Sequence, residues 1–115
     1  MIYIIEDDKT FAKCLERFCR PRATKIFNNV IDAISSIDKQ FPDLIFLDIL
    51  LTGPDGFTFL NELASYQDTA KIPIVVVSSL DFKNQDLSIY GVVGVLNKDT
   101  LTPKEIKKYA ERYSH

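Results

Sequence analysis

Residues 41–56 read FPDLIFLDILLTGPDG, and this stretch decides the fold. Pro42 opens it with a turn, and residues 44–47 form a short apolar run that is typical of a strand covered on both faces. The run ends in the carboxylate of Asp48 and in a Gly- and Pro-rich loop at residues 52–56. In an open parallel sheet, the loops past the carboxyl ends of the strands form the reactive crevice. Asp48 is therefore a candidate nucleophile or metal ligand, with a turn-capping Asp as the alternative.

The length and composition indicate one compact domain over residues 1–115. With 46% hydrophobic residues, the chain can bury a core without disulfides or metals. The formal net charge of −2 argues against a dedicated nucleic-acid binder. No apolar run approaches membrane-spanning length, and the apolar start meets acidic residues too early for a signal peptide. We therefore expect a cytoplasmic protein with no membrane contact.

The cysteines and the histidine exclude several kinds of site. Cys14 and Cys19 lie five residues apart in a helical pattern, which fits neither a metal site nor a disulfide framework. They are expected to be reduced thiols of a cytosolic protein. The only histidine is the last residue, His115, which argues against catalysis by a Ser/His or Cys/His pair.

Apolar periodicity predicts five strands that alternate with five helices. The strands are expected at residues 2–5, 23–27, 44–47, 74–77 and 92–97. The helices are expected at residues 10–20, after Asn28 or Asn29, from Gly56 or Phe57, at residues 81–90 as a short helix anchored by Leu87 and Tyr90, and from Pro103. This strict alternation predicts an α/β fold with a doubly wound parallel sheet and helices on both faces.

Polar side chains follow four of the five predicted strands. In chain order they are Glu6, Asp7 and Asp8, then Asp48, then Ser78 and Ser79, then Lys98. Because parallel strands bring their carboxyl ends to one edge, we expect these groups to converge. Clustered carboxylates repel unless a cation joins them, and magnesium prefers such hard oxygen ligands. A carboxylate can also act as a nucleophile toward phosphorus, with the cation, the ammonium and a hydroxyl binding the phosphoryl oxygens.

Each of these residues also has a purely structural explanation. An acid pair before a helix is most often a cap that complements the helix dipole. Lys98 by itself would be a solvated lysine, and Ser78 a turn residue.

The combination resembles the receiver domain of bacterial two-component response regulators, the CheY-like superfamily, over essentially the whole chain. The resemblance rests on the acid pair Asp7 and Asp8, Asp48, Gly56 eight residues later, the segment 73–78, and Lys98. It implies a flavodoxin-like fold with strand order 2-1-3-4-5.

The resemblance also implies a phosphorylation site. Asp48 would accept a phosphoryl group from a histidine kinase or phosphotransfer protein. Asp8 would bind Mg²⁺ (or Mn²⁺) directly and Asp7 through water, with Asp48 and the backbone carbonyl of Leu50 as further ligands. Such a domain is no enzyme in the usual sense, since it catalyses only its own phosphorylation and dephosphorylation.

Three further residues receive roles from the same resemblance. Ser78 would be the switch hydroxyl that moves to the phosphoryl oxygens, and Lys98 would pair with them. Ser79 would be the small residue beside the switch, with a swapped role as the alternative. Glu6 is expected to point away or to cap the helix.

Phosphorylation would move the loops after the fourth and fifth strands, because a new dianion attracts a hydroxyl and an ammonium. We expect Tyr90, Val95 and Tyr109 on the output face. The expected partners are the phosphoryl donor and a downstream output protein or domain, with a homodimer as a further option and no direct contact with nucleic acid. The chain is either a stand-alone receiver or a domain excised from a longer protein.

The sequence departs from the family pattern after the fifth strand. Asp99 follows Lys98 where the family usually has Pro, and Val95 replaces a common Tyr or Phe. In the family, the positions that Leu50 and Leu80 occupy here flank the phosphoryl group. Two leucines offer nothing to position an attacking water, so we expect slow self-dephosphorylation.

Three other functional classes share part of this pattern. A haloacid-dehalogenase-like phosphohydrolase needs a second Asp where Leu50 stands, and the acidic segment 6–9 would repel the phosphate of FMN in a flavodoxin-like FMN binder. A receiver-like protein-binding module that works without phosphorylation stays open as the alternative, because Val95 and Asp99 depart at the output end.

Overall fold

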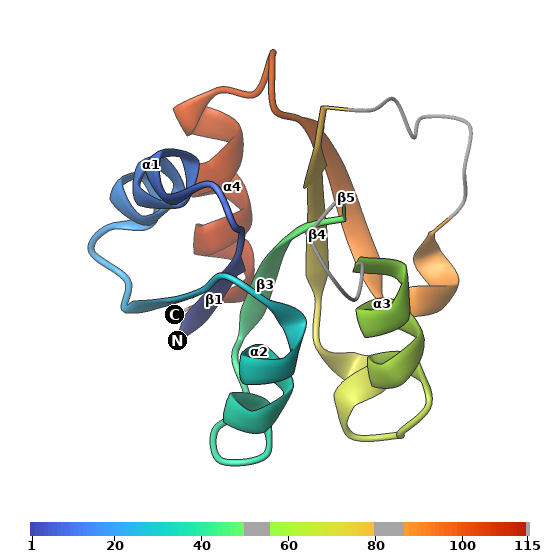
Figure 1. The fold of residues 1–115 in the computed structure, drawn as a ribbon. Helices are drawn as coiled ribbons and strands as arrows, with labels where there is room; N and C mark the ends of the chain where they lie inside the picture. Colours follow the sequence, from blue (N-terminus) through green and yellow to red (C-terminus); the bar gives the residue numbers. More distant parts are fainter. Residues whose placement is uncertain (50–55, 80–86, 115) are drawn as a thin grey trace.

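The computed structural model describes residues 1–49, 56–79 and 87–114 (Figure 1). Its strands are β1 (Ile2–Ile5), β2 (Thr24–Phe27), β3 (Leu44–Asp48), β4 (Ile74–Ser78) and β5 (Val92–Asn97). Its α-helices are α1 (Lys9–Cys19), α2 (Val30–Ile37), α3 (Gly56–Ala64) and α4 (Pro103–Tyr113), and short 3₁₀ turns lie at η1 (Thr69–Lys71) and η2 (Ser88–Tyr90). The five strands form one parallel sheet in the order β2-β1-β3-β4-β5, as predicted.

The register of the sheet brings the carboxyl ends of the strands to one edge. Ile5 pairs with Leu47 across β1 and β3, and Asp48 pairs with Val77 across β3 and β4. Since β3 is the central strand, the residue that ends it lies in the middle of this edge.

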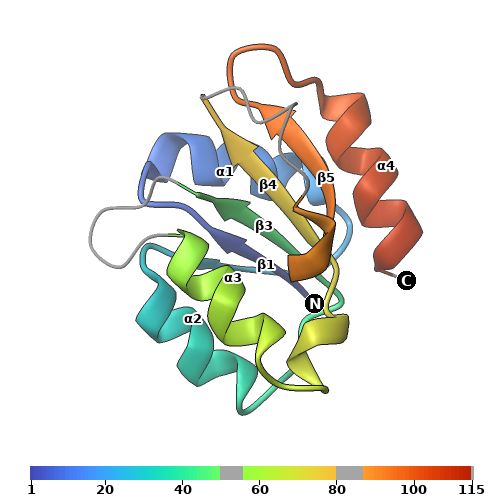
Figure 2. The same ribbon diagram turned by 90° about the vertical axis from the view of Figure 1, so that its right-hand side faces the viewer.

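Two hydrophobic clusters cover the two faces of the sheet. Alternate strand residues such as Tyr3 and Ile5 pack under α2 and α3, and Ile2 and Ile4 pack under α1 and α4. Figure 2 shows α2 and α3 on one side of the sheet and α1 and α4 on the other. None of the helices in the described part of the chain is long and apolar enough to cross a membrane.

Side-chain caps mark the starts of α1, α2 and α4. Asn29 caps α2, as one of the two predicted candidates. Thr102 and Glu105 form a capping box at the start of α4, with Pro103 in the first turn as predicted. Asp8 caps α1, because one of its carboxylate oxygens accepts the backbone N–H groups of Thr10 and Phe11 at 3.0 and 3.2 Å.

The predicted count of five helices is not matched, since the described residues contain four α-helices. Between β4 and β5, residues 80–86 lie outside the described part of the chain, and the described residues after them form the short turn η2. Leu87 has φ −100° and ψ 6°, outside the helical region, and Gly91 ends the turn at φ 81°. The two predicted anchors do hold this turn to the core, because Leu87 is buried and Tyr90 packs against the cluster that includes it.

Candidate functional site

Asp48 lies at the carboxyl end of the central strand, with a side chain that is almost entirely buried. The residue is 5% exposed, and the Lys98 ammonium contacts its Oδ2 atom at 3.1 Å. The end of the central strand therefore places a nearly buried carboxylate next to an ammonium.

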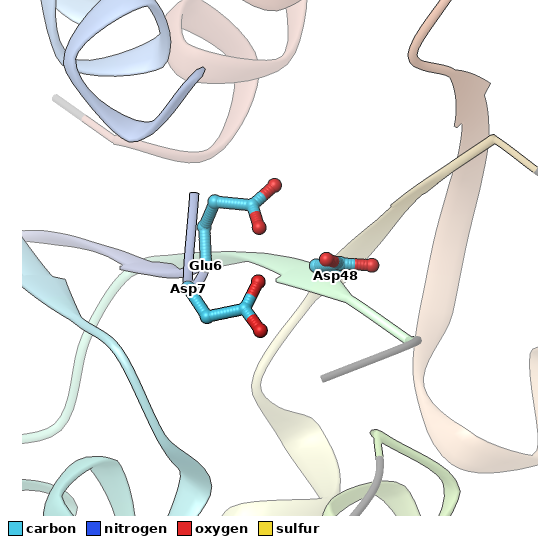
Figure 3. Close-up of side chains that lie close together, drawn as sticks. All are labelled: Glu6, Asp7 and Asp48. Carbon is cyan, nitrogen blue, oxygen red and sulfur yellow. The ribbon is translucent and has the colours of Figure 1, made fainter. Parts of the chain in front are cut away.

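Two more carboxylates reach the same point from the end of β1. Glu6, Asp7 and Asp48 each offer a carboxylate oxygen within 4.8 Å of the others. Figure 3 shows the carboxyl groups of Glu6 and Asp7 extending from the end of β1 toward Asp48. We call these three residues the acidic cluster. It is the only group of this kind among the described residues.

Lys98 contacts two members of the acidic cluster from the end of β5. Its Nζ atom lies 2.5 Å from Glu6 Oε1 and 3.1 Å from Asp48 Oδ2. The backbone of the same residue donates its N–H to the carbonyl oxygen of Ser78 at 3.0 Å, which fixes the end of β5 against the end of β4. The Lys98 ammonium therefore bridges two carboxylates that come from different strands.

The protonation equilibria of the site reflect this crowding. Burial raises the pKa of Glu6 from 4.5 to about 7; the lysine contact opposes this shift and the charge and hydrogen bond of Asp48 add to it. For Lys98, burial lowers the pKa, but the hydrogen bonds and charges of Glu6 and Asp48 outweigh it and the net direction is upward. The ammonium therefore stays charged at neutral pH, whereas Glu6 is partly protonated.

The expectation that Glu6 points away from the site was wrong. Glu6 is 2% exposed, and its carboxylate pairs with Lys98 inside the acidic cluster. Part of the expectation holds, since Glu6 also accepts the backbone N–H of Asp8 at 3.2 Å. Asp7 and Asp8, the predicted acid pair, do not act together, because the Asp8 side chain caps α1 while Asp7 belongs to the acidic cluster.

The start of α1 is the sequence feature from which the separate roles of Asp7 and Asp8 could have been predicted. The helix was predicted from Thr10, but it begins at Lys9. Starting it one residue earlier makes Asp8 the N-cap and leaves Glu6 and Asp7 to face the carboxyl edge of the sheet.

The serines after β4 differ in burial. Ser78 is fully buried as the last residue of β4, beside the backbone of Lys98, and Ser79 is exposed. Their switch roles stay predictions. Leu50, the predicted backbone ligand, and Leu80 lie outside the described residues.

Gly56 allows α3 to begin close to the end of β3. Its backbone N–H donates to the carbonyl oxygen of Ile49 at 3.1 Å. A Cβ atom at this position would lie 2.5 Å from the Cα atom of Ile49, closer than real contacts allow. Only glycine permits this approach, which accounts for its place eight residues after Asp48.

The predicted output residues come from opposite faces of the sheet. Tyr90 packs against the cluster under α3, and Tyr109, which belongs to α4, packs against the cluster on the other face. The hydroxyl of Tyr109 lies directly over Gly94, where an added Cβ would overlap it. Val95 is 38% exposed on β5, the edge strand between them.

The strand order and the two helical layers define a flavodoxin-like α/β domain with an acidic cluster at its carboxyl edge. The family model for the response regulator receiver domain matches residues 2–111. The chain therefore belongs to the receiver-domain family of response regulators, the proteins of two-component signalling.

Solved receiver domains share the fold over nearly the whole chain. The receiver domain of NtrX from Brucella abortus is 22% identical with a TM-score of 0.84, covering 98% of this chain and 97% of that one. The receiver domain of the sensor histidine kinase PA1611 from Pseudomonas aeruginosa PAO1 is 21% identical with a TM-score of 0.82, covering 97% and 94%. That structure is described as having a magnesium ion coordinated in its active site cleft.

A curated relative is a longer enzyme. A protein-glutamate methylesterase/protein-glutamine glutaminase from Chromobacterium violaceum is 29% identical over 99% of this chain. The chain spans 33% of the length of that relative.

Proposed function

We propose that this domain is a phosphoacceptor, in which Asp48 takes a phosphoryl group from a phosphohistidine in a histidine kinase or phosphotransfer protein. One observation carries the proposal: the nearly buried Asp48 carboxylate lies at the carboxyl end of the central strand, beside two further carboxylates and the Lys98 ammonium. Membership of the receiver family supports the same assignment.

The acidic cluster fits a divalent cation. Three carboxylates so close together repel one another, and the raised pKa of Glu6 shows the cost that burial and this crowding impose. Oxygen ligands of this kind suit Mg²⁺ or Mn²⁺. Glu6, Asp7 and Asp48 would hold the ion, with Glu6 in place of the Asp8 expected from the sequence. When bound, the ion would neutralise charge on the phosphoryl oxygens.

The residues of the chain then have defined roles in the transfer. A carboxylate oxygen of Asp48 forms a bond to phosphorus while the phosphorus–nitrogen bond of the donor breaks, and the electron pair of that bond stays on the imidazole nitrogen. Lys98 pairs with the phosphoryl oxygens from the position it already holds, 3.1 Å from Asp48. Ser78 donates its hydroxyl to them, and Ser79 leaves room beside it.

Phosphorylation would change the structure on the β5 side of the domain. Ser78 and Lys98 are joined through their backbones, so a dianion that attracts both would shift the ends of β4 and β5 together. Tyr90, Val95 and Tyr109 would report the shift to an output protein or domain, or to a second copy of the chain. This work would take place in the cytoplasm.

The intact mass of the protein after incubation with acetyl phosphate and Mg²⁺ tests the proposal. We expect a gain of one phosphoryl group that requires Mg²⁺ and is lost in Asp48→Asn. Asp8→Asn is the matched control, because Asn caps a helix as well as Asp does and should leave the gain unchanged. No gain in the folded wild type would favour the alternative, a protein-binding module that works without phosphorylation.

A further inference from the structure

Lys98 contacts an aromatic ring as well as two carboxylates. Its Nζ atom lies 4.8 Å from the centre of the Phe11 ring, while the same ammonium pairs with Glu6 and Asp48. An ammonium over the face of a ring at this distance is attracted by the electrons of the ring. Lys98 thus has partners at the end of β1, on β3 and on α1.

Phe11 is held in place by its own packing. It lies in the first turns of α1 and packs, partly buried, against the hydrophobic cluster under α1 and α4. It also lines a cavity of about 330 Å³ beside the ammonium. The other residues around this cavity are Asp8, Thr10, Cys14, Leu15, Phe18, Lys98 and Leu101. The Lys98 side chain therefore has room to move without leaving the ring.

The charges of the acidic cluster require the Lys98 side chain to move when a divalent ion binds. A divalent ion and the ammonium would compete for the same carboxylate oxygens, and Glu6 is the closest partner of Lys98 at 2.5 Å. When an ion takes Glu6, the ammonium must loosen this contact and still stay within reach of Asp48. The neutral ring of Phe11 can hold a cation without competing for the metal.

We propose that Phe11 is a positioning residue, whose ring holds the Lys98 ammonium beside Asp48 when a divalent cation occupies the acidic cluster. The inference rests on the proposed function, because the purpose of this placement is to meet the incoming phosphoryl oxygens. It assigns a functional contact to α1 in addition to its packing.

The first test replaces the ring and measures phosphorylation. Phe11→Leu should slow phosphorylation by acetyl phosphate and weaken beryllofluoride binding by about 3- to 10-fold, as expected for one partly desolvated cation–ring contact. Magnesium affinity should change by less than about twofold, because the ring contributes no ligand to the ion. Phe18→Leu is the matched control: it makes the same change in the same helix and cavity, seven residues along, and should leave both values unchanged.

A second variant separates the electronic role of the ring from its volume. Trifluorophenylalanine at position 11 keeps the shape of the ring but removes most of the negative charge from its face. It should reproduce most of the Phe11→Leu defect. A normal rate with this variant would show that Phe11 acts only through packing, and would overturn the proposal.

An NMR measurement tests, independently of activity, whether the Phe11 ring holds the Lys98 ammonium. Protons on the ε carbon of Lys98 should be shifted upfield by the ring in the NMR spectrum, and the shift should persist when Mg²⁺ is added and vanish in Phe11→Leu. Loss of the shift on adding Mg²⁺ to the wild type would overturn the proposal. If the wild type gains no phosphoryl group, the proposed function fails, and this shift still decides whether Phe11 holds the ammonium.

Discussion

The two edges of the sheet differ in how far their carboxylates are neutralised by neighbouring groups. At the amino edge, the single carboxylate of Asp43 accepts hydrogen bonds from the Met1 ammonium at 2.8 Å and from the Ser114 hydroxyl at 3.2 Å. At the carboxyl edge, the three carboxylates of the acidic cluster lie close together, and the ammonium of Lys98 pairs with two of them, Glu6 and Asp48. The first arrangement is balanced and lies at the surface, since the Asp43 side chain is 47% exposed.

This difference favours the carboxyl edge as the edge of the sheet that binds a cation. A balanced surface pair ties the ends of the chain together and gains little from another charge. A cluster in which three carboxylates crowd together, two of them buried, is stabilised when a cation binds it. The concentration of negative charge at the carboxyl edge is thus the feature that a structural role alone does not explain.

The largest expected effect is on metal affinity. Glu6→Gln and Asp7→Asn should each weaken Mg²⁺ binding by about 10-fold or more, because each removes one charged ligand from the cluster. Asp8→Asn should change it by less than about twofold, since Asp8 caps α1. Isothermal titration of the three variants checks this ranking. A larger loss for Asp8→Asn than for Glu6→Gln would restore the acid pair inferred from the sequence.

The next effect is on stability as the pH changes. Because the pKa of Glu6 is raised from 4.5 to about 7, the folded state favours the protonated carboxyl. This contribution is fully present below pH 4.5 and is lost as the pH rises through 7. The metal-free wild type should therefore lose up to about 3 kcal/mol of unfolding free energy over this range relative to Glu6→Gln.

Urea denaturation at several pH values measures this difference. Mg²⁺ should restore the wild type at pH 8 and have less effect on Glu6→Gln, because an ion that binds only the folded state stabilises it. Parallel pH profiles for the two proteins would contradict the assignment of the raised pKa to Glu6.

Removing the glycine under Tyr109 should have a moderate effect. In Gly94→Ala, the new methyl group would overlap the Tyr109 hydroxyl and force the Tyr109 ring away from β5. We expect a loss of about 1–3 kcal/mol in unfolding free energy. Adding Tyr109→Leu should recover most of it, because the overlapping atoms are gone. An equal loss in the double variant would mean that the glycine is needed for the strand itself.

The smallest effect is expected at the amino edge. Asp43→Asn should cost no more than about 1 kcal/mol of unfolding free energy and leave Mg²⁺ binding unchanged, because the pair is exposed to solvent. Thermal unfolding at low and high salt, with a magnesium titration beside it, checks both expectations. A loss of Mg²⁺ affinity in this variant would contradict the assignment of metal binding to the carboxyl edge alone.

Much of this molecule could be predicted from the sequence because its three central strands are nearly pure apolar runs. The runs at Leu44–Asp48 and Ile74–Ser78 are fully buried, and short apolar runs bounded by turn residues are typical of central parallel strands. Placing Asp48 and Lys98 at one edge followed from this topology alone.

The details that escaped prediction depend on single residues at the ends of elements. The choice between Asp7 with Asp8 and Glu6 with Asp7 depends on whether α1 begins at Thr10 or Lys9, and helix ends carry the weakest sequence signal. Glu6 was also expected to point away or to cap the helix. It is buried because it pairs with Lys98, which is 92 residues away in the sequence. Contacts over such separations are set by the sheet rather than by local pattern.

Locating the phosphorylated residue tests the central claim most directly. The protein would be phosphorylated with acetyl phosphate and Mg²⁺ and then reduced with borohydride, which converts an aspartyl phosphate to homoserine, before peptide mass spectrometry. We predict homoserine at position 48, dependent on Mg²⁺ and lost in Glu6→Gln at limiting Mg²⁺. Homoserine at position 7 or 8, or none in a folded protein that binds Mg²⁺, would contradict the assignment of Asp48 as the acceptor.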